Sequence, residues 1–188
     1  WALNLARDLD LVPALIAATS PADPWAAVTA WAASQPRRDV LARATLLDLP
    51  VALLGETAAP AAPWRVTHRP ATFHPGAPTV VNLGALWAGP LAAHLLGRAG
   101  AHVIDVESTT RPDPTSERSP QFYRLLHDGH ERQRVDFTDT AALHAIVSAA
   151  DIVIESSRPR ALRGLGIDAD TILADGRART WVRITGHP

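Results

Sequence analysis

Apolar residues recur along this chain with two different spacings. Over residues 1–47 they return every three or four positions, which is typical of amphipathic helices. Asp23 followed by Pro24 predicts an N-cap with proline in the first turn, and so a helix over 24–34. A further helix is expected over 37–47, and the apolar run at 50–54 predicts a short strand.

From Thr79 onward, short apolar runs alternate with helical patterns. The expected strands are 80–83, 102–107, 134–137, 152–155 and 180–185. The expected helices are 88–98, 139–149, 157–165 and 168–174, with a shorter helical piece near 122–126 and with Thr138 as the cap before 139. Continuous apolar strands that alternate with helices predict an α/β fold, in which helices cover both faces of a parallel sheet.

Proline content separates these two parts of the chain. Residues 56–78 hold five of the sixteen prolines and show little periodicity, so they predict a linker. We therefore expect a mainly helical segment over 1–55, a proline-rich linker over 56–78 and the α/β part over 79–188.

Composition narrows the class of protein. The 188 residues are 47% hydrophobic and 20% charged with a net charge of −1, which gives no overall attraction to nucleic acid or to a membrane surface. Cysteine is absent, which excludes disulfides and thiolate metal ligands, and no apolar run approaches the ~20 residues of a membrane span. We expect a cytoplasmic protein. All eighteen basic residues are arginine, so a lysine phosphate clamp is excluded.

Polar residues, glycine or proline stand where four of the expected strands stop, at 83–88, 107–111, 155–158 and 185–187. Ligands of parallel sheets bind beyond these carboxyl ends. Arginines at 158, 160 and 163 are suited to phosphate, although a solvated helix face explains them equally. Glu107 ends the second strand, where a dinucleotide fold binds ribose. The turn GALWAG does not match G-x-G-x-x-G, however, which argues against a nicotinamide cofactor.

Several motifs follow one another in a fixed order. They are VVNLGALWAGPLAAHLLGRAG (80–100), AHVIDVES, RPDPT, HDGHERQRVDF (127–137), ADIVIESSRPRALRGLG (150–166) and TWVRITG. Together they resemble family III coenzyme A (CoA) transferases, the group that includes formyl-CoA and carnitine CoA-transferases and α-methylacyl-CoA racemase. The resemblance implies that 79–188 is the Rossmann-like CoA-binding part of such a domain, incomplete at its C-terminus.

The resemblance also implies which residues contact CoA. The turn after the first strand would lie along the pantetheine and thioester, and residues after Glu107 would flank the adenine. His130 falls on a lysine near phosphate, and Arg163 is the expected substitute for an arginine that Gly164 replaces. The implied binding residues are Leu86, Trp87, Ala88, Ser108, Arg111, His130, Ser156, Ser157, Arg158, Arg163, Thr185, Gly186 and His187. Trp87 has a second interpretation, as a core aromatic.

The resemblance further implies that an aspartate attacks the acyl thioester and that CoA passes to a carboxylic acid through a mixed anhydride. That aspartate is expected beyond Pro188, so no residue here is assigned as catalytic. The alternatives are an acyl-CoA racemase or isomerase of the same fold, and a non-catalytic CoA-binding subunit. The expected partners are acyl-CoA, a small carboxylic acid, and a second copy in an interlocked homodimer or another chain that completes the fold.

A metal site is the remaining candidate. His127 and His130 have an H-x-x-H spacing, with Asp128 between them. Two histidines on a loop without a third fixed ligand are weak evidence for metal. We therefore expect no metal.

Overall fold

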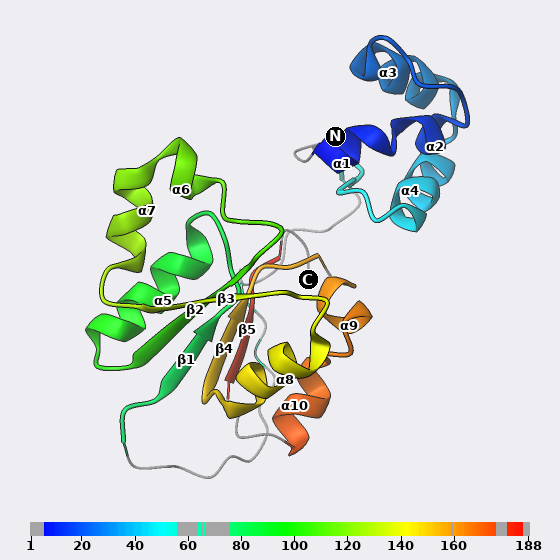
Figure 1. Ribbon diagram of the computed structural model, residues 1–188. Helices are drawn as coiled ribbons and strands as arrows, with labels where there is room; N and C mark the ends of the chain where they lie inside the picture. The colour runs from blue at the N-terminus through cyan, green and yellow to red at the C-terminus, as the bar shows by residue number, and fades with distance from the viewer. Residues whose placement is uncertain are drawn as a thin grey trace. The chain divides into compact units, whose positions relative to one another are not determined.

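The computed structural model describes residues 6–55, 64, 66, 76–158, 160–175 and 180–185 (Figure 1). The chain divides into two compact units, Trp1–Trp64 and Arg65–Pro188. The boundary falls inside the expected linker, 56–78, most of which lies outside the described residues. The three-part division of the chain stays a prediction.

The first unit is helical. Its helices are α1 (Ala6–Asp10), α2 (Val12–Ile16), α3 (Pro24–Ser34) and α4 (Arg37–Leu46). The Asp23 carboxylate accepts hydrogen bonds from the backbone N–H groups of Trp25 and Ala26, both at 3.0 Å, which confirms the expected N-cap. A small core forms where these helices meet, built from Val12, Leu15, Val28, Ala44 and Leu49.

The prediction of a strand at 50–54 is wrong, because these residues form no strand. A strand needs a neighbouring strand to pair its backbone N–H and C=O groups. All the described regular elements of this unit are helices. Val51 of the apolar run instead packs against the helical core, which includes the preceding Leu49.

The second unit is an α/β domain, as expected. Its five parallel strands are β1 (Thr79–Asn82), β2 (His102–Ser108), β3 (Glu131–Val135), β4 (Ile152–Glu155) and β5 (Thr180–Arg183), in the order β3-β2-β1-β4-β5. The helices are α5 (Ala88–Arg98), α6 (Thr115–Arg118), α7 (Pro120–His127), α8 (Thr140–Ala149), α9 (Ala161–Gly164) and α10 (Ala169–Asp175). Among the described helices of either unit, none combines the length and the hydrophobicity that a bilayer crossing requires.

Helices cover both faces of the sheet (Figure 1). Val80, Val103 and Ile154 pack with Ala93 of α5 on one face. On the other face, Val81, Val106 and Val153 pack with α8, α9 and α10. Neighbouring residues such as Val80 and Val81 thus enter opposite cores. This accounts for the continuous apolar strands.

The starts of two helices differ from expectation. The helix expected from residue 157 begins only at Ala161 and is one turn long. The N-cap of α8 is Asp139, whose carboxylate accepts a hydrogen bond from Ala142 N–H at 3.0 Å. The Thr138 hydroxyl donates instead to Asp136 at 2.8 Å, so the expected threonine cap is wrong by one residue.

Leu143 tests the core beneath α8, because its side chain is 0% exposed. We expect Leu143→Ala to lower the free energy of unfolding by about 2–5 kcal/mol, the usual cost of a buried cavity. Urea unfolding of the full chain measures this change. Leu125→Ala is the matched control, since Leu125 is 63% exposed and its truncation should change stability by less than about 0.5 kcal/mol. Equal effects of the two substitutions would contradict the assigned core.

Candidate functional site

The turn between β1 and α5 is fixed by side chains from three strand ends. Each holds a different backbone N–H group of the turn: Asn82 Oδ1 accepts from Gly84 at 3.0 Å, Ser156 Oγ from Ala85 at 3.4 Å, and Asp113 Oδ2 from Leu86 at 2.8 Å. Asn82 ends β1, Asp113 follows β2 and Ser156 follows β4. Residues far apart in the sequence therefore meet at the carboxyl edge, where parallel sheets bind ligands.

The tip of this turn faces outward. Leu86 is 53% exposed and Trp87 60% exposed, so Trp87 is not a core aromatic in the described structure. Leu86 has a φ of 69°, a left-handed conformation that leucine disfavours. Its hydrogen bond to the buried Asp113 holds it there. Trp87 precedes α5 without a side-chain cap, so no side chain caps the amides of the first turn.

Two glycines allow the turn to close on the start of α5. A Cβ atom on Gly89 would lie 3.0 Å from the Gly84 Cα and 3.1 Å from Asn82 Oδ1. A Cβ atom on Gly84 would lie 3.0 Å from each of the Gly89 Cα and Asn82 Oδ1. At either position a Cβ atom would force the facing backbone and the buried Asn82 amide to give by a few tenths of an ångström, and backbone cannot turn aside as a flexible side chain can.

Acidic side chains at this edge accept hydrogen bonds from backbone N–H groups and from an arginine of the same sheet. Glu107 Oε1 accepts the Asp113 N–H at 2.6 Å, and Asp113 also accepts the Thr115 N–H at 2.8 Å. Glu155 is buried; it accepts from Arg183 Nε at 2.7 Å and from Ser157 N–H at 2.9 Å. These three carboxylates brace the loops around the edge.

The predicted binding residues fall into three groups. Leu86, Trp87, Ala88 and Ser156 belong to the braced turn or contact it. The side chains of Ser108, Ser157 and Arg158 are partly buried beside the ends of β2 and β4, and Arg111 and Thr185 are exposed. Arg163 is exposed at the end of α9, with its Nε 3.2 Å from Asp168 Oδ2. Gly186 and His187 lie outside the described residues.

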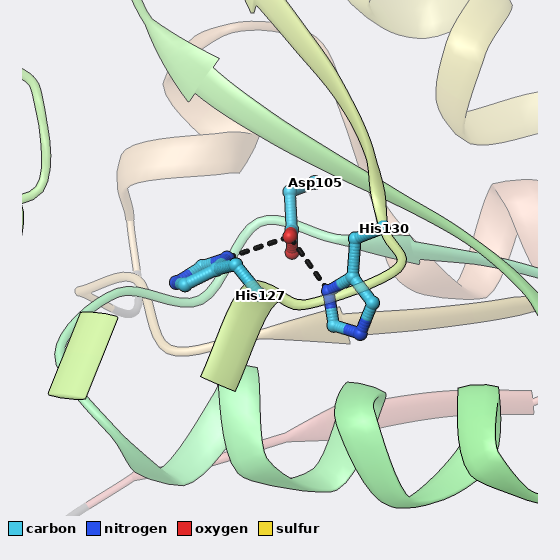
Figure 2. A group of neighbouring side chains, drawn as sticks. All are labelled: Asp105, His127 and His130. Carbon is cyan, nitrogen blue, oxygen red and sulfur yellow. Dashed lines mark hydrogen bonds and ion pairs between the residues drawn. The ribbon is translucent and has the colours of Figure 1, made fainter. Parts of the chain in front are cut away.

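His130 lies elsewhere. It precedes β3, and its side chain is only 3% exposed. Its Nδ1 lies 2.7 Å from Asp105 Oδ2, and the same oxygen lies 2.6 Å from His127 Nδ1 (Figure 2). A phosphate contact by His130 would require the ring to leave Asp105. That role stays a prediction, now with this structural condition attached.

Asp105 is charged despite its burial. Burial is the strongest influence and by itself raises the pKa, but hydrogen bonds from His127, Asn82 and His130 together hold the pKa of Asp105 below its ordinary value. Asn82 donates its Nδ2 to Asp105 Oδ1 at 2.8 Å. Because an ionised carboxylate only accepts, both imidazoles donate their Nδ1–H groups to it.

Three residues that position these groups escaped the sequence analysis, namely Asn82, Asp105 and Asp113. For Asp113, the sequence carries a local signal of its capping role. Asp113-Pro114 precedes α6 just as Asp23-Pro24 opens α3, and such Asp-Pro pairs indicate a capping carboxylate. For Asp105 and Asn82 the sequence gives no local signal, because their partners come from other segments.

The sequence matches known proteins over the α/β unit. The sequence profile of CoA-transferase family III matches residues 77–186, more than half of the chain, and the chain therefore belongs to this family. It is 26% identical over 119 residues to a succinyl-CoA–L-malate CoA-transferase alpha subunit of Chloroflexus aurantiacus, covering 57% of this chain and 28% of that protein. It is 28% identical over 117 residues to a succinyl-CoA–D-citramalate CoA-transferase of the same organism, covering 57% and 29%.

Solved structures agree with this assignment. A CaiB/BaiF family protein from Brucella suis superposes with a TM-score of 0.53 and 26% identity, over 57% of this chain and 32% of that chain. A protein of Mycobacterium tuberculosis described as hypothetical gives a TM-score of 0.50 and 27% identity over the same shares. The chain thus spans less than a third of the length of these relatives.

The close approach of Gly84 and Gly89 can be tested directly. Gly89→Ala should lower the free energy of unfolding by about 1–3 kcal/mol, the usual cost of overpacking, because its Cβ meets backbone at 3.0 Å. Gly164→Ala is the matched control: a Cβ there meets nothing within 4 Å, so its stability should be unchanged or slightly raised. Urea unfolding measures both. A Gly89→Ala variant as stable as the wild type would refute the packed turn.

Proposed function

We propose that this chain binds the CoA portion of an acyl-CoA at the carboxyl edge of the sheet, as the CoA-binding half-site of a CoA-transferase. The braced turn over 84–88 carries the proposal. Side chains from three strand ends fix its backbone and present Leu86 and Trp87 to solvent just before α5. Such a preorganised, partly apolar surface suits the pantetheine arm, and uncapped amides at a helix start suit an oxyanion.

The proposed reaction moves CoA between two carboxylic acids. An aspartate oxygen attacks the acyl carbon of the donor thioester, the C–S bond breaks, and the CoA thiolate leaves a mixed anhydride. The thiolate then attacks the aspartyl carbonyl, which releases the donor acid and forms an aspartyl–CoA thioester. The acceptor carboxylate repeats these steps in reverse and leaves as the new acyl-CoA. Each step forms an oxyanion that backbone N–H groups stabilise.

The attacking aspartate in this proposal comes from polypeptide beyond Pro188. The carboxylates of Glu107, Asp113 and Glu155 are already engaged by backbone N–H groups or by Arg183. A nucleophile needs a carboxylate oxygen free to reach the thioester carbon. We therefore assign these three residues to bracing the site and not to the chemistry.

The nucleotide end of CoA is assigned to the arginines after β4. Arg158 precedes the one-turn helix α9 and Arg163 lies within it; this helix is too short to contribute a strong helix dipole. Charge and bidentate hydrogen bonding by guanidinium groups would therefore hold the diphosphate. Ser108 and Arg111 are assigned to the adenine, as the family resemblance implies. The complete protein is proposed to be an interlocked homodimer.

CoA binding tests the assignment of Arg163. We expect Arg163→Ala to weaken CoA binding by about 10- to 100-fold, because a charge-assisted hydrogen bond is worth about 1.5–3 kcal/mol. Calorimetric titration of the full chain with CoA measures the affinity. Arg38→Ala is a matched control from the helical unit, since Arg38 pairs with a neighbouring Asp39 at 3.4 Å much as Arg163 pairs with Asp168. Equal affinities of the two variants would remove Arg163 from the site.

Acyl exchange tests the reaction class. The complete protein, given succinyl-CoA and a free carboxylic acid, should transfer CoA to that acid, and a trapped aspartyl–CoA thioester should be detected by mass spectrometry. A racemase would instead exchange the α-hydrogen of a branched acyl-CoA with deuterium from the solvent when no acceptor acid is present. Binding of CoA without either activity would identify a non-catalytic subunit.

A further inference from the structure

The cluster of Asp105, His127 and His130 lies apart from the braced turn that carries the proposed CoA site. Its members come from three segments: Asp105 from the middle of β2, His127 from the last residue of α7, and His130 from the residue before β3. Both imidazoles point their Nδ1 atoms at Asp105 Oδ2 (Figure 2). Two nitrogens and one oxygen thus converge on one point between the sheet and the α7–β3 turn.

We propose that Asp105, His127 and His130 form a binding site for one zinc-type divalent metal ion. All three candidate ligand atoms lie within 4.8 Å of one another. The expectation of no metal rested on the lack of a third fixed ligand beside the H-x-x-H pair, for which Asp128 was the carboxylate considered. The structure places Asp128 at the surface and supplies Asp105 instead.

Burial and orientation favour a built site over a chance grouping. The side chains of His127, His130 and Asp105 are 7%, 3% and 7% exposed. Asn82 holds the second carboxylate oxygen at 2.8 Å and thereby aims the first toward the imidazoles. Hydrogen-bonded outer residues of this kind orient ligands in metal sites.

The geometry requires only a small expansion. Without metal, the two Nδ1–H groups crowd one oxygen at 2.6 and 2.7 Å. Tetrahedral bonds of about 2.0–2.1 Å separate ligand atoms by roughly 3.3 Å, so each imidazole nitrogen must move away from the carboxylate oxygen by about 0.6–0.7 Å. His127 is the last residue of α7 and His130 precedes β3, so most of the movement falls on the exposed turn between them, which contains Gly129 with a φ of 78°.

The second nitrogen of His130 also fits the proposal. Its Nε2 is buried without a partner among the described residues, and so is the Nδ1 of His94 on α5. The two rings lie with centroids 5.7 Å apart. Metal binding at Nδ1 leaves the remaining proton of His130 on Nε2, in the ring that lies beside His94. His127 stacks on Tyr123 with centroids 4.1 Å apart, which fixes the plane of its ring.

The donor set selects the class of metal. Two imidazole nitrogens and one carboxylate oxygen suit Zn²⁺ and its neighbours Co²⁺ and Ni²⁺, whereas Mg²⁺ and Ca²⁺ prefer oxygen ligands only. An ion here would tie the end of α7 and the start of β3 to β2. Because only the folded chain brings these three segments together, metal binding would stabilise the folded state beyond the two hydrogen bonds that already join them.

The test titrates the chelator-treated full chain with ZnCl₂ by calorimetry and with CoCl₂ by visible absorption. One ion per chain is expected, with the absorption of four-coordinate Co²⁺ and a raised thermal midpoint. Asp105→Asn and His130→Gln should each weaken binding by more than about 100-fold, since loss of an outer partner alone costs about 10- to 100-fold. His144→Gln, which changes an exposed histidine on α8, should bind like the wild type.

Absence of zinc binding by the wild type would overturn the proposal. Equal binding by the wild type and Asp105→Asn would also overturn it, because the ion would then occupy an adventitious surface site. If the variants fail to fold, ¹H–¹⁵N spectra of the imidazole groups in the wild-type protein test the zinc site instead. Zinc should shift the Nδ1 signals of two buried histidines, and shifts confined to exposed histidines would exclude the site. CoA titrations remain a separate measurement, so failure here leaves the proposed function standing.

Discussion

The side-chain amide of Asn82 joins the two polar centres of the α/β unit. It lies at the end of the central strand β1 and is 1% exposed. Its oxygen accepts the Gly84 N–H of the turn, and its nitrogen donates to Asp105. An amide supplies an acceptor and a donor in one plane, whereas a carboxylate or an apolar side chain of similar size leaves one partner unsatisfied. A buried unpaired group costs about 1–3 kcal/mol, so both centres depend on this residue.

Local sequence patterns predicted the elements whose environment is uniform along the chain. The bounds of α5 and β4 match expectation because apolar runs with clear breaks bound them. A strand was predicted at 134–137, whereas β3 lies at Glu131–Val135. The sequence of β3, ERQRV, gives a weak apolar signal because the strand lies at the edge of the sheet, where it is less buried than a central strand. At 50–54, an apolar run predicted a strand, yet the helices beside it offered a core and no pairing partner.

The candidate site shows where sequence reasoning stops. Family motifs singled out Trp87 and Ser156 as predicted CoA-binding residues at strand ends. The structure exposes Trp87 and brings Ser156 to the turn, and the CoA contacts stay predictions. The contacts that fix the turn span 27 residues to Asp113 and 71 to Ser156, and only the parallel sheet brings such positions together. Likewise, Asp128 is adjacent to the histidines in sequence, while Asp105, 22 residues upstream of His127, is their partner in space.

The contact between Gly84 and Gly89 offers a way to recognise this turn in other chains. Contacts among Asn82, Gly84 and Gly89 make a Cβ atom at either glycine a tight fit, at 3.0–3.1 Å from its neighbours. Their spacing, Asn-x-Gly followed by four residues and Gly, is therefore set by geometry and differs from the nucleotide-binding glycine fingerprint. A search pattern built on these three positions would detect the same turn in distant sequences whose ligand-facing side chains have diverged.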